Sequence, residues 1–408
     1  MSGTESLTGD APASTAASPT AVMLGRAGLI LAGLLLAVIA VEVGFRVAGP
    51  NVPLDLTMAR FQVYHPVYGF FHAPGASGWL RTREFTAYVK FNSRGLRGPE
   101  VALPKPAGTY RMLVMGDSVV EAAQVNAEQT MVSLLQDRVR QRAGGRQVEI
   151  INAGVAGFGQ GQELLFLQRE LGAYQPDAIV LVVTIANDLA DNSVAVAKRW
   201  KLAAERRPFF QVGADGRLQA IPFQPPPEES LGSLRAFARD RSTLFNVLEL
   251  WWVGKTVARA QGSVIPPLDA EREVYLREPG EDWQQAWSIS ERLLVELNAT
   301  AAALNAPLII ILSPAQWQMS SAGWRELVGS GNNAERRFGL EQPGIRLGEI
   351  AQRNGLTMLD LLPTFRHASD DDRATLYFKE DGHWNERGHQ VAAETIDRFL
   401  QSNALPPP

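Results

Sequence analysis

Apolar residues in most of the chain fall into two alternating patterns. Short, nearly continuous apolar runs begin at residues 110, 148, 178, 308 and 355: YRMLVM, VEII, AIVLVVT, LIIIL and GLTMLDL. Between them, apolar residues recur three or four positions apart, which predicts helices over 129–142, 160–172, 285–304 and 386–400. Strands of this kind alternating with amphipathic helices predict a parallel sheet covered on both faces. The expected fold class is therefore α/β, with three layers and a five-stranded parallel sheet.

Two segments interrupt this alternation. Residues 50–108 hold β-prone pieces such as FTAYVKF among many Gly and Pro residues, and predict a small β-rich lead-in. Residues 193–284 hold a predicted hairpin, QVGADGRLQAIP, then a proline run and the pair Trp251 and Trp252. We interpret this second segment as an insertion whose role the sequence does not indicate. The remaining parts, 109–192 and 285–400, have the combined length of one α/β domain.

The N-terminal segment joins a polar tail to a long apolar run. Residues 1–25 open with a stretch rich in Ser, Thr, Ala and Pro, which is typical of a disordered tail. Residues 26–48 carry no polar or charged residue from Ala27 to Val41, and predict a transmembrane signal anchor. A signal peptide and a buried helix are the alternatives, although no convincing small-residue cleavage site follows. The few flanking arginines slightly favour a cytoplasmic C-terminal part.

Composition narrows the possible chemistry. The chain has 39 Lys and Arg against 43 Asp and Glu, a formal net charge of −4, and no basic run interleaved with aromatics. No nucleic-acid partner is therefore predicted. The absence of cysteine excludes disulfides, thiolate metal sites and cysteine nucleophiles. GVAGFGQG lacks the Lys and Ser or Thr of a P-loop, and its glycine spacing is wrong for a dinucleotide site. With no metal-ligand spacing among the histidines, no cofactor or metal is predicted.

Polar residues follow four of the five predicted strands, at the sheet edge where open parallel sheets bind ligands. They are Gly116-Asp117-Ser118, the Gly-rich INAGVAGFGQG (151–161), IANDLADN (185–192) and KEDGHWNERGH (379–389). Together they supply a hydroxyl, backbone amides, a carboxamide, and an acid next to a histidine, which are the parts of an acyl-transfer site. For Ser118 alone, a turn followed by a helix cap is the simpler alternative.

These four blocks resemble those of the SGNH (GDSL-type) hydrolases, in the order of that family. The resemblance covers residues 109–192 and 355–400 well, and the middle of the chain poorly. In the lead-in, YHPVYGFFHAPG and FNSRGLRG look like the segment that precedes the core in membrane-anchored bacterial members. The resemblance implies a flavodoxin-like α/β/α fold. The sequence contains no G-x-S-x-G elbow, which argues against the α/β-hydrolase fold.

The resemblance also implies a catalytic triad. By position, Ser118 would be the nucleophile, His383 the base and Asp381 its orienting acid. The family's acid usually lies three residues before the histidine, where this chain has Glu380. A two-residue spacing occurs in related polysaccharide O-acetyltransferases, so Asp381 is favoured and Glu380 stays an alternative. The fourth letter of GDSL is Val119 here.

An oxyanion hole is implied in the same way. Its donors would be the backbone amides of Ser118 and Gly157 and the side-chain amide of Asn187. Gly157 is chosen because NAGVAG aligns with the family block, with Gly154 as the alternative. The family's glycine two residues before the asparagine is Ile185 here, a departure from the family pattern.

The function expected from the resemblance is a membrane-anchored serine esterase that cleaves or transfers an acyl group, an acetyl group by preference, on an envelope carbohydrate. The catalytic domain would be extracytoplasmic in a bacterial inner membrane, as in the family's anchored members. A lipid esterase or thioesterase, a polysaccharide O-acetyltransferase, and an inactive binding module on the same fold are the alternatives. Substrate, acyl acceptor and oligomeric state stay open.

Overall fold

The computed structural model describes residues 19–48, 61–185, 187–199, 207–222, 238, 242, 244–245, 248, 272–329, 332–372 and 375–405. Residues 1–18 of the predicted tail lie outside this set, as do Trp251, Trp252 and most of the predicted insertion.

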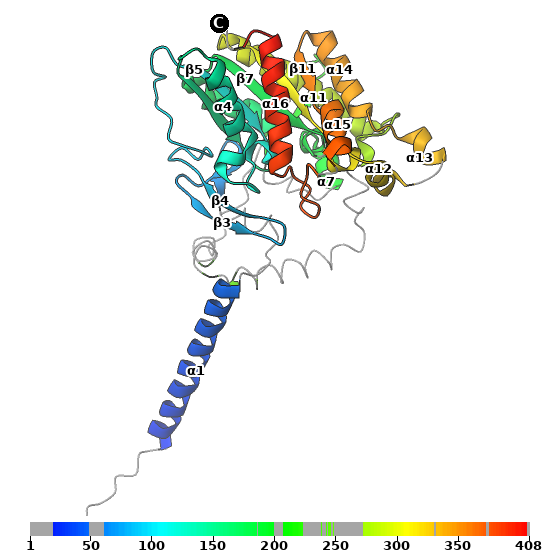
Figure 1. Ribbon diagram of the computed structural model, residues 1–408. Helices are drawn as coiled ribbons and strands as arrows, with labels where there is room; N and C mark the ends of the chain where they lie inside the picture. The colour runs from blue at the N-terminus through cyan, green and yellow to red at the C-terminus, as the bar shows by residue number, and fades with distance from the viewer. Residues whose placement is uncertain are drawn as a thin grey trace, which may run out of the picture.

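A five-stranded, wholly parallel sheet forms the centre of the fold (Figure 1). Its strands are β5 (Tyr110–Gly116), β6 (Val148–Gly154), β7 (Ala178–Thr184), β10 (Leu308–Ser313) and β11 (Thr357–Asp360). Their order across the sheet is β11-β10-β7-β5-β6. The predicted α/β fold is confirmed. The order reverses beside β5, and such a switch point places a crevice beyond the carboxyl ends of the central strands.

Helices cover both faces of the sheet, because successive strand residues point to opposite sides. Along β5, Met112 and Val114 pack in the core that includes α4 (Met131–Arg142), α15 (Leu362–Asp372) and α16 (Glu386–Ser402). Leu113 and Met115 pack on the other side with α5 (Gln160–Arg169), α11 (Glu281–Ala303) and α14 (Gln342–Asn354). Figure 1 shows α4 and α16 side by side over one face.

The described part of the lead-in, residues 61–108, contains two hairpins. They are β1 (Gln62–His65) with β2 (Gly69–His72), and β3 (Ser77–Arg81) with β4 (Thr86–Lys90). Phe85 and Val89 of the second hairpin region share a small buried core with Ala122 and Ala123, just after Ser118, and with Phe378, just before Asp381. The lead-in is therefore packed against two of the segments that carry predicted site residues.

The connections between β7 and α14 are more broken than the sequence pattern predicts. Short helices α6 (Asp188–Asp191) and α7 (Val194–Arg199) follow β7, and α12 (Ser321–Val328) and α13 (Asn332–Arg337) follow β10. The hairpin within the insertion is present as β8 (Phe209–Val212) and β9 (Leu218–Ile221). Helix α5 ends earlier than predicted, and a 3₁₀ turn over Leu171–Tyr174 continues it.

The N-terminal apolar run forms helix α1 (Pro19–Ala48). Its stretch Met23–Gly44 has a mean hydropathy of 2.4 over its most apolar window, and none of that window is buried. Figure 1 shows α1 as a single rod that leads away from the α/β body. By length and composition this helix could cross a membrane, and a signal sequence has the same properties.

Candidate active site

A tight turn at the end of β5 presents Ser118. Gly116 has φ +157°, and a Cβ there would lie 2.5 Å from Val120 Cγ2, so only glycine fits without a shift. The Asp117 carboxylate accepts the Val119 N–H at 2.9 Å and caps the one-turn helix α3 (Ser118–Glu121). The cap is therefore Asp117, which leaves the Ser118 hydroxyl available at the first helical position.

Ser118, His383 and Asp381 form a hydrogen-bonded chain. His383 Nε2 lies 2.8 Å from Ser118 Oγ, and His383 Nδ1 lies 2.7 Å from Asp381 Oδ1. The turn between acid and base is made by Gly382 at φ +81°, which folds the Asp381 carboxylate under the ring. The Glu380 side chain is exposed. An imidazole placed between a hydroxyl and a carboxylate is positioned to take the hydroxyl proton.

The backbone amides of Ser118 and Gly157 differ from that of Gly154 in their hydrogen bonds. The N–H groups of Ser118 and Gly157 donate to no protein atom in the described ranges. The Gly154 N–H, by contrast, donates to Asn152 Oδ1 at 3.0 Å. A Cβ at Gly154 would lie 2.3 Å from the Glu121 backbone nitrogen, so this glycine serves close packing against α3. This geometry favours Gly157 over Gly154 as an oxyanion donor, and its role stays a prediction.

The Asn187 side-chain amide is held by carboxylates. Its Nδ2 lies 3.1 Å from Asp117 Oδ2, and 3.4 Å from both Asp188 Oδ1 and Asp191 Oδ2. Asp117 itself also accepts from the Thr184 hydroxyl at 2.9 Å. A carboxamide carries two N–H groups, so Asn187 can donate one to Asp117 and the other to Asp188, to Asp191 or, in their place, to a substrate oxygen.

The carboxylates around Asn187 are buried, and burial changes their protonation. It raises the pKa of Glu163 well above that of an ordinary glutamate, and the neighbouring Asp117 raises it further. The pKa of Asp188 is raised well above its ordinary value for the same two reasons, with Glu163 adding to them. Burial also raises the pKa of Asp191, opposed by Arg207, whose Nη1 lies 2.8 Å from Asp191 Oδ1.

Two contacts to predicted site segments come from lead-in residues that the sequence pattern does not indicate. Gln62 Nε2 donates to the Ala156 carbonyl at 3.0 Å, across 94 residues. The Glu84 carboxylate accepts the backbone N–H groups of Glu380 and Asp381 at 2.9 and 2.8 Å, across nearly 300 residues. No local pattern marks either residue, because each depends on a partner far away in the sequence.

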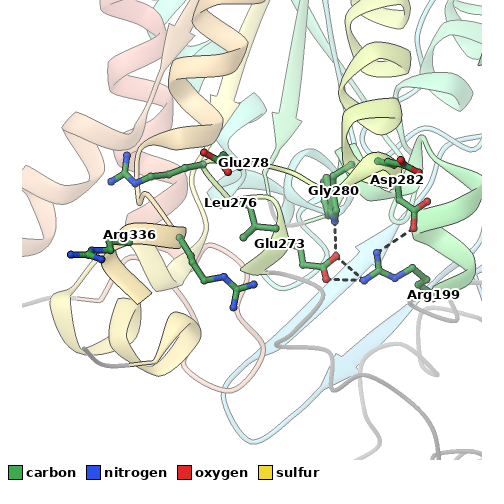
Figure 2. Close-up of a pocket in the computed structure, with 11 residues that line it drawn as sticks. Arg199, Glu273, Leu276, Glu278, Gly280, Asp282 and Arg336 are labelled. Atoms are coloured by element: carbon green, nitrogen blue, oxygen red, sulfur yellow. Dashed lines mark hydrogen bonds and ion pairs between the residues drawn. The ribbon is translucent and has the colours of Figure 1, made fainter. Parts of the chain in front are cut away.

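A cavity of about 620 Å³ lies elsewhere on the domain, beside α7, α13 and the start of α11 (Figure 2). Arg199 in its wall pairs with Glu273 at 2.7 Å and with Asp282 at 3.3 Å. None of Ser118, Asp381 or His383 is among the residues that line it. Four arginines face four acidic residues there, so its charge favours neither cations nor anions: Arg199, Arg277, Arg336, Arg337, Glu273, Glu278, Glu281 and Asp282.

The five-stranded parallel sheet with helices on both faces is consistent with the α/β/α fold of the SGNH hydrolases. Residues 272–407 of the chain match the family described as "SGNH hydrolase-like domain, acetyltransferase AlgX". The matched segment includes Asp381 and His383 and does not reach Ser118. The resemblance found in the sequence is confirmed at the level of this domain.

Solved structures that match part of the chain include several esterases. LAE5, an α/β hydrolase from the metagenome of Lake Arreo, Spain, is 15% identical, with 72% of this chain and 95% of that chain covered, at a TM-score of 0.39. The acetyl xylan esterase AlAXEase is 12% identical, with coverage of 71% and 99% and a TM-score of 0.39. Axe2, an acetylxylan esterase from Geobacillus stearothermophilus, is 12% identical, with coverage of 72% and 93% and a TM-score of 0.39. No curated protein matches the chain.

Proposed function

We propose that the chain is a membrane-anchored SGNH esterase that forms an acyl-enzyme on Ser118. The observation that carries the proposal is the hydrogen-bonded chain from Ser118 Oγ through His383 to Asp381, with contacts of 2.8 and 2.7 Å. His383 takes the proton of Ser118 as the hydroxyl attacks the ester carbonyl, and Asp381 stabilises the imidazolium that results. His383 then returns the proton to the departing alcohol.

The developing oxyanion is stabilised by three donors at the same edge of the sheet. The amides of Ser118 and Gly157 have no acceptor within the described part of the chain, and Asn187 adds its side-chain amide. Donors fixed in advance favour the tetrahedral intermediate over the planar ester, which lowers the barrier to its formation. In the second half of the reaction, water or a sugar hydroxyl attacks the acyl-enzyme with the same groups in reversed roles.

The proposed substrate is an acyl ester, an acetyl ester by preference, on an envelope carbohydrate. The match to a domain named for an acetyltransferase supports the acetyl group, and favours O-acetyl transfer as the second candidate. Helix α1 would anchor the enzyme in a bacterial inner membrane with the catalytic domain outside the cytoplasm. Its apolar stretch of 22 residues is long enough for that role. A lipid ester or thioester is the alternative substrate.

The test uses the full chain in detergent with p-nitrophenyl acetate. We expect release of nitrophenol and an acetyl adduct on the peptide that contains Ser118. Ser118→Ala should abolish both, while Ser402→Ala, an exposed serine at the end of α16, should keep both. Equal behaviour of wild type and Ser118→Ala would sink the proposal. Adding acetylated oligosaccharides and then an unacetylated acceptor separates hydrolysis, seen as free acetate, from transfer, seen as a newly acetylated acceptor.

A further inference from the structure

The Gly157 amide belongs to a peptide group whose other end is held by the lead-in. The carbonyl oxygen of that peptide is Ala156 O, and Gln62 Nε2 of strand β1 donates to it at 3.0 Å. Within the described residues the sole cis peptide is Leu103–Pro104, so the Ala156–Gly157 peptide is trans. In a planar trans peptide the C=O and N–H bonds point in opposite directions. A group that fixes the carbonyl therefore fixes the direction of the Gly157 N–H as well.

We propose that Gln62 is a positioning residue that aims the Gly157 N–H at the oxyanion. The proposal rests on the function proposed above. This peptide needs an anchor because it adjoins a glycine in the left-handed region, at φ +83°. A glycine has no Cβ to oppose rotation of the adjoining peptides, so the orientation must come from hydrogen bonds. The hydrogen bond also polarises the peptide, which strengthens its N–H as a donor.

The Ala156 amide is held by α3, the helix that begins with Ser118. The Ala156 N–H donates to Glu121 Oε2 at 2.6 Å. Glu121 is the last residue of α3, the helix that begins with Ser118, and its side chain has no exposed surface. Gln62 and Glu121 thus hold the two polar groups of Ala156, and the loop is tied directly to the helix that presents the nucleophile.

A buried histidine of the lead-in completes this support. His72 Nε2 lies 2.8 Å from Glu121 Oε2, and His72 Nδ1 lies 2.8 Å from the Gly95 carbonyl. A carbonyl only accepts, so Nδ1 carries a proton, and one further proton lies between Nε2 and the carboxylate. Both side chains are fully buried, and breaking such a pair is costly. The lead-in therefore holds the Ala156–Gly157 segment in two ways: Gln62 of β1 contacts it directly, and His72 of β2 acts through Glu121.

The test replaces Gln62 in the full chain. Gln62→Met keeps the length of the side chain and removes its N–H donor, and Gln62→Lys keeps a donor at similar reach. Removal of an oxyanion donor lowers kcat by about 10²–10³-fold. A donor that is present but misoriented should therefore lower kcat by ~10-fold to ~10²-fold. We expect this fall for Gln62→Met with KM within about twofold, as for an interaction made only in the transition state. Gln62→Lys should recover most of the rate.

The matched control is Gln168→Met. Gln168 lies near the C-terminal end of α5, and the substitution removes an N–H donor that contacts Thr300 Oγ1 at 3.4 Å. It should leave kcat unchanged. If Gln62→Met lowers the melting temperature and leaves kcat unchanged, Gln62 merely ties the hairpin to the core and the proposal is wrong. Gln62→Lys as slow as Gln62→Met would also overturn it.

Amide hydrogen exchange separates this inference from the proposed function, because it needs no turnover. Exchange of the amides in 155–158 should quicken in Gln62→Met and stay unchanged in Gln168→Met. Unchanged exchange in Gln62→Met overturns the positioning role even if the enzyme is active. Inactivity of wild type with quickened exchange would reject the esterase while supporting Gln62 as the anchor of this peptide.

Discussion

Asp381→Asn removes the negative charge beside His383 while it keeps the size of the side chain. Asp381 Oδ1 lies 2.7 Å from His383 Nδ1. In the proposed mechanism His383 becomes a cation when it takes the proton of Ser118, and the carboxylate stabilises that cation through a charge-assisted hydrogen bond. Asparagine offers an uncharged oxygen, or an N–H group that favours the wrong tautomer of the ring. The loss should therefore fall on the transition state and spare substrate binding.

The size of the effect follows from the geometry. Two unit charges about 4 Å apart attract by about 4 kcal/mol at an effective dielectric constant of about 20. The side chains of His383 and Asp381 are 28% and 11% exposed, so water screens part of this attraction. A net loss of about 2–4 kcal/mol corresponds to a fall in kcat of ~30-fold to ~10³-fold. KM should change little, because the cation forms only as the reaction proceeds.

The assay is the initial rate of p-nitrophenyl acetate hydrolysis by the full chain. The neighbouring residue offers a matched control, because Glu380→Gln makes the same change from carboxylate to amide on an exposed side chain. We expect its kcat to stay within about twofold of wild type, as is usual for surface substitutions. A larger loss for Glu380→Gln than for Asp381→Asn would refute the assignment of the acid. Full activity in both variants would refute the triad mechanism itself.

Two further predictions concern stability, measured by urea unfolding. Gly154→Ala should destabilise the fold more than Gly157→Ala, because its Cβ would lie 2.3 Å from a backbone nitrogen, whereas the nearest atom at Gly157 is 3.4 Å away. Gly157→Ala should then cost only the backbone strain of about 1–2 kcal/mol, and equal losses of stability in the two variants would contradict this reading. The second prediction concerns His389, whose pKa burial lowers from 6.5 to about 3. The unfolded chain therefore binds a proton that the folded chain does not, and stability falls as the pH drops below 6.5. From pH 7 to pH 5 this group should cost about 2 kcal/mol, a loss that His389→Gln removes; the same pH dependence in both proteins would refute it.

The sequence predicted the sheet well because its strands are nearly continuous apolar runs. Val180 and Val182 pack toward one helical layer and Leu181 and Val183 toward the other, and only a strand covered on both faces needs apolar residues at every position. The helices between β10 and α14 were missed because each is too short to show a period. Parts of the site that lie at strand ends could be placed in advance, since parallel strands end at one edge.

The choice between Asp381 and Glu380, and between Gly157 and Gly154, depends on contacts between segments far apart in the sequence. Asp381 reaches His383 across a turn in which Gly382 adopts a left-handed backbone and the Glu84 carboxylate accepts the Glu380 and Asp381 amides. These contacts join the lead-in to the C-terminal loop. Sequence spacing within KEDGH carries no information on either condition. The roles of the lead-in residues were likewise hidden, because a lone glutamine or glutamate in a hairpin resembles any solvated side chain.

The carboxylates around Asn187 pose an electrostatic problem for the proposed mechanism, because an oxyanion beside Ser118 would be opposed by nearby negative charge. Burial reduces this negative charge, because it raises the pKa values of Glu163 and Asp188 and so favours their neutral forms. Neither oxygen of the Glu163 carboxyl has a hydrogen-bond partner in the described residues, which suits a group held without charge. Asp191 is offset by Arg207 at 2.8 Å. The cluster can therefore hold the Asn187 amide in place without setting four full negative charges against the intermediate that this amide would stabilise.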